Sequence, residues 1–183
     1  MMDVNVLKKY QQQATLIAFY GDCDNTDTFS VGKILSVDDD FVLLGCVTPT
    51  GEYDGCCVYR TDHCILIEQD TQYLKKIETL CGLKHTKWEE MKIGDHILDT
   101  TLQYAIDQNY CVSIELCDSG FYDVQGRVRS LSTEYMTVDC LTDFGLPNGM
   151  AHIPLAQITK VRINAVEEQT VNLLYNRESK SQA

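Results

Sequence analysis

Apolar and polar residues alternate along most of this chain, and the alternation stops at short runs rich in Asp, Gly, Pro and Thr. Alternation with a period of two is typical of half-buried strands, and such polar runs form the turns between them. The pattern therefore predicts two groups of strands that follow one another along the chain. The strands of the first group are expected at 15–21, 29–37, 41–48 and 56–67, the last as one long strand or two short ones. Those of the second group are expected at 111–117, 124–131, 135–142 and 150–163.

Helical spacing of apolar residues predicts helices before and after each group. A short helix with Asp3 as its N-cap opens the chain, and Val171, Leu174 and Tyr175 share one face of the last helix. Trp88 is expected to begin a longer helix, broken near Gly94, and to fill the contact between the two groups. The expected helices cover residues 3–13, 71–80, 88–108 and 166–176, with a short linker at 82–87.

The two groups repeat one sequence, so that Gly32 recurs as Gly126, 94 positions later. Internal repeats of this kind indicate a repeated structural unit. The copies share Gly32/Gly126, Ser36/Ser130, Cys46/Cys140, Thr48/Thr142, Gly51/Gly145 and Gly55/Gly149, together with the apolar positions between them. They differ at the polar pairs Asp38/Ser132, Arg60/Pro154 and His63/Gln157. The repeat thus predicts two copies of one scaffold and argues against two equivalent binding sites.

Consecutive short strands joined by tight turns predict an antiparallel sheet that curls into a small barrel. The fold class we expect is mainly β with flanking helices, in the form of two tandem small bent antiparallel barrels. The first domain is expected at residues 1–81 and the second at 88–176, followed by a polar tail at 177–183. Because domains this small bury a modest fraction of their surface, we expect them to pack together or against another subunit.

Net charge and cysteine content argue against several classes of function. The formal net charge is −12, from 15 basic and 27 acidic residues, and the sequence has no basic block of the kind that binds DNA. The nine cysteines form no CxxC pair, and no apolar run reaches membrane-spanning length. We therefore expect reduced core cysteines in a cytoplasmic protein, without membrane, metal or cofactor.

Two clusters could carry chemistry. Asp38, Asp39 and Asp40 could attract a cation, but three consecutive residues cannot all face one ion, and a solvated turn is the favoured interpretation. Cys57 and His63 could share a strand face, yet two ligands do not make a metal site, and no orienting group or oxyanion hole accompanies them. Catalysis by a cysteine is therefore the least favoured hypothesis, and we expect a protein that is not an enzyme.

The segment Val31-Gly32-Lys33-Ile34-Leu35-Ser36-Val37-Asp38-Asp39-Asp40-Phe41 resembles the first signature of the Sm-like (LSm) fold, and Val58-Tyr59-Arg60-Thr61 partly matches the second. In the second copy Gly126, Val128, Leu131 and Tyr135 match, with Ser132 in place of the Asp. The chain thus resembles a divergent tandem Sm-like protein of the bacterial or phage type. The resemblance implies five-stranded bent barrels that join edge to edge into rings, and many members of this family bind uridine- or adenosine-rich RNA.

The resemblance carries over poorly to RNA binding. The family position that contacts the base holds Val42 and Met136, neither of which can form a hydrogen bond with a base. Candidate contacts with RNA or a partner are Asp38, Phe41, Arg60, Arg127, Arg129 and Tyr135. Arg127 and Arg129 share a strand face and could pair with acidic groups across an interface or contact a phosphate, and the interface is the favoured interpretation given the negative net charge. The favoured function is a homo-oligomerising or protein-interaction module, and degenerate RNA binding is the alternative.

Overall fold

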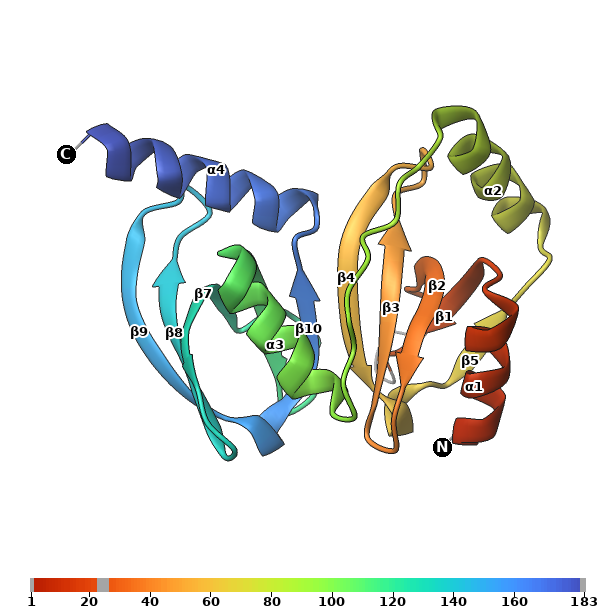
Figure 1. Ribbon diagram of the computed structural model, residues 1–183, viewed down its shortest axis with the longest axis horizontal. Coiled ribbons are helices and arrows are strands. Elements are labelled where there is room, and N and C mark those ends of the chain that lie inside the picture. The colour runs from red at the N-terminus through yellow and green to blue at the C-terminus, as the bar shows by residue number, and fades with distance from the viewer. Residues whose placement is uncertain (1, 23–26, 182–183) are drawn as a thin grey trace. The chain divides into compact units, whose positions relative to one another are not determined.

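The computed structural model describes residues 2–22 and 27–181, with side chains up to residue 178, and is mainly β with four helices (Figure 1). The chain divides into two compact units, Met1–Ile97 and Leu98–Ala183. The boundary lies later along the chain than the linker expected at 82–87. Each unit is described below by itself.

The first unit contains five antiparallel strands in the order β5-β1-β2-β3-β4. A helix precedes the sheet and another follows it, and α1 lies against β2. Within this unit the terminal strands β4 and β5 each pair on one side only. The elements are α1 (Val4–Gln13), β1 (Ile17–Tyr20), β2 (Ser30–Val37), β3 (Phe41–Val47), β4 (Tyr53–Arg60), a 3₁₀ turn (Thr61–His63), β5 (Leu66–Glu68) and α2 (Gln72–Lys84).

The second unit repeats this order as β10-β6-β7-β8-β9, again with every pairing antiparallel. Its last helix, drawn in blue in Figure 1, contacts β6. The elements are α3 (Ile97–Gln108), β6 (Cys111–Leu116), β7 (Val124–Leu131), β8 (Tyr135–Leu141), β9 (Pro147–Pro154), a 3₁₀ turn (Leu155–Gln157), β10 (Ile158–Ile163) and α4 (Val166–Ser181).

The repeat extends to the irregularities of the two sheets. The pairing of β2 with β3 shifts register between Ile34 and Ser36, and that of β7 with β8 shifts between Val128 and Ser130. A second shift, in β3–β4 and in β8–β9, also falls at equivalent positions. Bulges bend a strand and increase its twist, so both sheets bend at the same places. The two copies are therefore alike in local geometry as well as in strand order.

Glycine is required where two strands approach closely. A Cβ atom on Gly32 would lie 2.1 Å from the carbonyl oxygen of Gly45, and one on Gly126 would lie 2.1 Å from that of Asp139. The shared Gly51 and Gly145 have φ values of +80° and +73°, a conformation that side chains rarely adopt. These contacts explain why the repeat keeps its glycines.

The first unit buries both faces of β1. Leu7 of α1 packs in one cluster with Ile17 and Phe19, whereas Leu74 of α2 packs in another cluster with Ala18. Successive side chains of a strand point to opposite faces, so α1 and α2 cover opposite sides of the sheet. This arrangement explains why the sequence of β1 is apolar throughout rather than alternating.

The helix expected over 88–108 is wrong in its first half. Residues 86–94 have no regular structure, and the helix begins at Ile97. Trp88 instead packs against the core cluster of the first unit that contains Leu16, Val31 and Leu74, with Tyr53 edge-on to its ring at 6.1 Å. The segment that follows α2 therefore belongs to the first unit. The segment 56–67, expected to form one long strand or two short ones, contributes to two strands, β4 and β5, separated by the 3₁₀ turn, and the single strand expected at 150–163 is divided in the same way into β9 and β10.

Candidate functional site

Three of the six candidate contacts lie together at one end of the first sheet. The Oδ1 atom of Asp38 accepts hydrogen bonds from the backbone N–H groups of Asp40 (3.0 Å) and Phe41 (2.7 Å), which forms the β2–β3 turn. Its Oδ2 atom accepts from the N–H of Ile97 at 2.8 Å. Phe41 lies directly opposite Arg60 in the β3–β4 pairing. Asp38 is thus committed to backbone donors, which is a structural role.

Arg60 is held by a neighbouring carboxylate. Its Nε and Nη2 atoms donate to the two carboxylate oxygens of Asp62 at 2.9 and 2.7 Å. These hydrogen bonds lower the pKa of Asp62, although partial burial acts in the opposite direction. The hydroxyl of Thr61 donates to the carbonyl of Asp39 and so fixes the start of the 3₁₀ turn against the β2–β3 turn. A ligand phosphate would have to compete with Asp62 for the guanidinium of Arg60.

The second unit builds the same turn with different chemistry. The hydroxyl oxygen of Ser132 accepts from the backbone N–H of Tyr135 at 3.1 Å, as Asp38 accepts from Phe41 in the first unit. Tyr135 is 54% exposed and lies opposite Pro154 in the β8–β9 pairing. The exchange of Asp38 for Ser132 therefore preserves a turn cap, and the two copies share more polar function than their residue types indicate.

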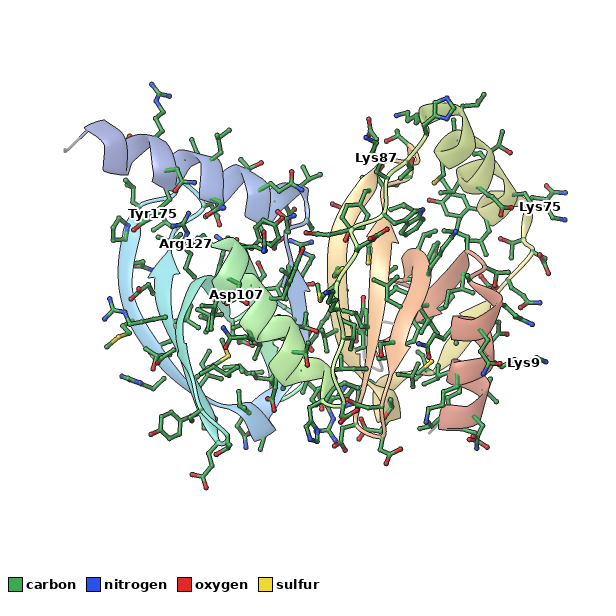
Figure 2. The ribbon with its side chains drawn as sticks, in the orientation of Figure 1. Lys9, Lys75, Lys87, Asp107, Arg127 and Tyr175 are labelled. Atoms are coloured by element: carbon green, nitrogen blue, oxygen red, sulfur yellow. The ribbon has the colours of Figure 1, made fainter. Side chains whose placement is uncertain are left out.

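Arg127 is bound to α4 of its own unit. Its guanidinium donates to the side-chain oxygens of Asn172 (2.9 Å from Nε) and Asn176 (2.8 Å from Nη2) and lies 4.5 Å from the ring centre of Tyr175. Figure 2 shows Arg127 and Tyr175 beside one another next to α4. Tyr175 also packs against the cluster that contains Cys111. Arg127 thus fastens the helix to the sheet.

Arg129 has its acidic partner within the same unit. Its Nε and Nη2 atoms contact the carboxylate of Asp139 at 3.0 and 2.8 Å, and both side chains are largely exposed. The carboxylate belongs to β8, the neighbouring strand. The pairing expected of Arg129 is therefore made inside the unit, and exposed pairs of this kind contribute little stability.

Four of the eight cysteines that the structure describes are buried, three are half-buried and Cys117 is exposed, whereas Cys23 lies outside the described residues. Burial raises the pKa of Cys56, Cys64 and Cys111 to about 12 in each case, which keeps these thiols protonated. Cys57 packs in the core cluster with Leu7, whereas the ring of His63 lies 3.7 Å from Asp62.

Within 2–22 and 27–181, no group of three or more His, Cys, Asp or Glu side chains is placed to hold a metal ion. Within the same ranges, no helix has the length and apolarity needed to cross a bilayer.

One buried charged residue is not among the candidates expected from the sequence. Glu168 of α4 has no exposed surface and contacts Ser113 of β6 and Arg162 of β10. The signal was available, because Glu168 precedes Val171 by three residues and so lies on the apolar face of the helix. A carboxylate on an apolar helix face indicates either a buried partner or a site.

Comparisons with known proteins give no family. No family model matches the chain, and no curated protein matches it. Among solved structures, the chain has a weak similarity to YcgR of Escherichia coli, solved in complex with c-di-GMP, at 10% identity and a TM-score of 0.20 over 98% of this chain and 90% of that one. A similarity at this level carries no argument about fold or function, so the proposals below depend on the residues themselves.

Proposed function

We propose that this protein is a non-catalytic interaction module in which two tandem Sm-like barrels assemble through the edges of their sheets. The observation that carries the proposal is the strand order. Each unit has five antiparallel strands behind a leading helix, and β5 of the first unit and β9 of the second each pair with a single strand, β1 and β8. Terminal strands of this kind are templates for pairing with another sheet.

Exposed apolar side chains on two of these strands support the proposal. Leu66 of β5 is 45% exposed and Met150 of β9 is 51% exposed. Large apolar side chains on an edge strand favour association, because pairing would remove them from water along with the backbone groups. Repeated contact of one kind of edge with the other is heterologous, and such contacts close into a ring or continue as a filament.

Charge substitutions at these edges test the proposal. Leu66→Lys and Met150→Lys each place a charge on an exposed edge position, so the fold should tolerate them while assembly is lost. Leu83→Lys is the matched control, because Leu83 is 73% exposed but lies on α2, away from the strands. Light scattering should show a lower particle mass for the two edge variants and an unchanged mass for Leu83→Lys. Equal masses for all three variants and the unmodified chain would contradict assembly through the sheet edges.

RNA binding is the second candidate, and the grouping of Phe41, Arg60 and Asp38 at one end of the first sheet favours it. Two observations make it the weaker one. Arg60 is paired with Asp62, and the side chains of Val42 and Met136, at the position that contacts a base in the family, are 0% exposed. Retention on oligo-U or oligo-A columns at moderate salt, lost in Arg60→Ala, would support RNA binding. Passage through both columns would end that proposal.

A further inference from the structure

The second unit holds a buried polar trio under α4. The carboxylate of Glu168, 0% exposed, accepts a hydrogen bond from the hydroxyl of Ser113 at 2.5 Å and another from Nε of Arg162 at 2.9 Å, both at Oε1. Ser113 and Arg162 are paired residues on the neighbouring strands β6 and β10, so both side chains face the same helix. The trio therefore joins one helix to two strands.

The carboxylate of Glu168 has Ser113 and Arg162 as its hydrogen-bond donors. Its Oε2 atom is buried and has no hydrogen-bond partner among the described residues. Arg162 also contacts Glu167 and lies 4.8 Å from the ring centre of Tyr122. Burying a carboxylate is unfavourable unless donors and an opposite charge compensate for the lost water. Glu168 is thus tolerated only where a sheet presents such a pair of residues.

The first unit supplies an internal comparison. Gly32 pairs with Ile17 as Gly126 pairs with Val112, so Ser113 corresponds to Ala18. Arg162, the strand partner of Ser113, corresponds to Glu68, the strand partner of Ala18. Glu168, the third residue of α4, corresponds to Leu74, the third residue of α2.

The corresponding contact in the first unit is apolar. Leu74 and Ala18 are each 2% exposed and pack in one core cluster. Glu68 accepts a hydrogen bond from the hydroxyl of Tyr20 rather than contributing to a buried ion pair. The same place in the fold therefore carries two different contact sets.

We propose that these two contact sets act as a pairing code that matches each helix to its own sheet. The units share strand order, bulges and glycines, so α2 and α4 are competing ligands for two similar surfaces while the chain folds. Placed on the first sheet, α4 would bury Glu168 against Ala18 and beside the carboxylate of Glu68. Placed on the second, α2 would leave Ser113 and Arg162 facing Leu74, with no acceptor. Each mismatch creates an unpaired buried polar group, the means by which binding surfaces reject wrong partners.

Reciprocal grafts in the full chain test the code. Leu74→Glu creates the mismatch in the first unit, and Leu74→Glu combined with Ala18→Ser and Glu68→Arg installs the trio of the second. Glu168→Leu creates the opposite mismatch, and Glu168→Leu combined with Ser113→Ala and Arg162→Met installs an apolar set. The measurements are the equilibrium constant for unfolding in urea and the amide hydrogen exchange of α2 and α4.

Each single mismatch should raise the unfolding constant roughly a hundredfold or more and speed exchange in the affected helix, because it leaves buried polar groups unpaired. Each matched triple should recover at least about tenfold of that loss. Recovery in both units is the result expected of a code. A triple no more stable than its single mismatch, in either unit, would overturn the proposal, as would a harmless Leu74→Glu.

A milder pair keeps the test decisive if Leu74→Glu does not fold. Leu74→Gln places a polar group at the same position without the charge, and Ala18→Ser then supplies its donor. The code predicts that Ala18→Ser stabilises the Leu74→Gln chain and destabilises the unmodified chain, where Leu74 offers it no acceptor. The same effect of Ala18→Ser in both backgrounds would contradict the code.

Discussion

The close approach of strands at Gly32 and Gly126 makes the sharpest prediction about the fold. Gly32→Ala or Gly126→Ala would place a methyl carbon 2.1 Å from a backbone carbonyl oxygen of the neighbouring strand. A carbon and an oxygen atom in favourable contact are about 3.3–3.6 Å apart, so these two atoms would have to separate by about 1.2–1.5 Å. The obstacle is backbone rather than a flexible side chain, and so it cannot rotate away.

The size of the effect follows from this overlap. Overpacking a well-packed interior costs about 1–3 kcal/mol, and weakening a neighbouring ladder hydrogen bond adds about 1 kcal/mol. We therefore expect each substitution to destabilise the fold by about 3 kcal/mol. For a chain of this length that loss corresponds to a fall in Tm of about 6–12 °C.

Urea unfolding followed by far-UV circular dichroism measures the loss. Trp88, the single tryptophan of the chain, packs on the core of the first unit, so its fluorescence reports Gly32→Ala in particular. Gly82→Ala is the control, since a Cβ atom at this position of α2 meets nothing within 4 Å. That change should stabilise the fold by up to about 1 kcal/mol. If Gly32→Ala and Gly126→Ala behaved like Gly82→Ala, the close approach of the strands would be refuted.

Other predictions concern the cysteines, the arginines and one carboxylate. Alkylation of the native protein at pH 8 should modify the exposed Cys117 and spare Cys111, because burial raises the pKa of Cys111 to about 12. Peptide mass mapping identifies the labelled cysteines, and labelling of Cys111 in the native protein would contradict its burial. Arg127→Ala should lower the free energy of unfolding in urea by about 1–2 kcal/mol, because it removes the hydrogen bonds that hold α4 to the sheet. Arg129→Ala should lower it by less than about 1 kcal/mol, because its ion pair is exposed. The reverse order would refute these two roles. The neighbouring Arg60 lowers the pKa of Asp62 in the folded protein. The stabilisation that this ion pair gives the fold is therefore present at neutral pH and is lost as the pH falls through the folded-state pKa of Asp62. Asp62→Asn should therefore lower stability near pH 7 by less than about 1 kcal/mol and have no effect at the lowest pH; an equal loss at every pH would contradict the pairing.

The repeat made most of the fold predictable. Buried positions must recur with a period of two in a strand, and glycines must recur wherever backbones touch, so both survive in the sequence. Expected strands such as 41–48 and 135–142 agree with β3 and β8 to within a residue. The turns were predictable for the same reason, because Asp38 and the glycines at turns restrict the backbone locally.

The segment between α2 and α3 was not predictable in this way. Trp88 was expected to begin a helix, but its ring packs against the first core, and residues 86–94, which surround it, have no regular structure. Tertiary packing therefore decides the structure here. The helix expected at 71–80 runs on to Lys84 as α2, and it ends there because His85 adopts a left-handed conformation at φ 51° and caps it.

The polar candidates also differ in whether the sequence predicts their contacts. Asp38 was predictable as a turn residue, and Ser132 shows that another residue type can perform the same task. The partners of Arg127 were not predictable, because Asn172 lies 45 positions further along the chain. Such long-range contacts depend on the packing of α4 on the sheet, which the sequence near Arg127 does not encode.

The mass of the native particle tests the central claim, assembly through sheet edges, most directly. Sedimentation velocity at increasing protein concentration, without tags, would give that mass for a chain of 20.7 kDa. The account predicts a closed assembly or a growing series at multiples of the chain mass. A single species of one chain mass at every concentration would contradict it.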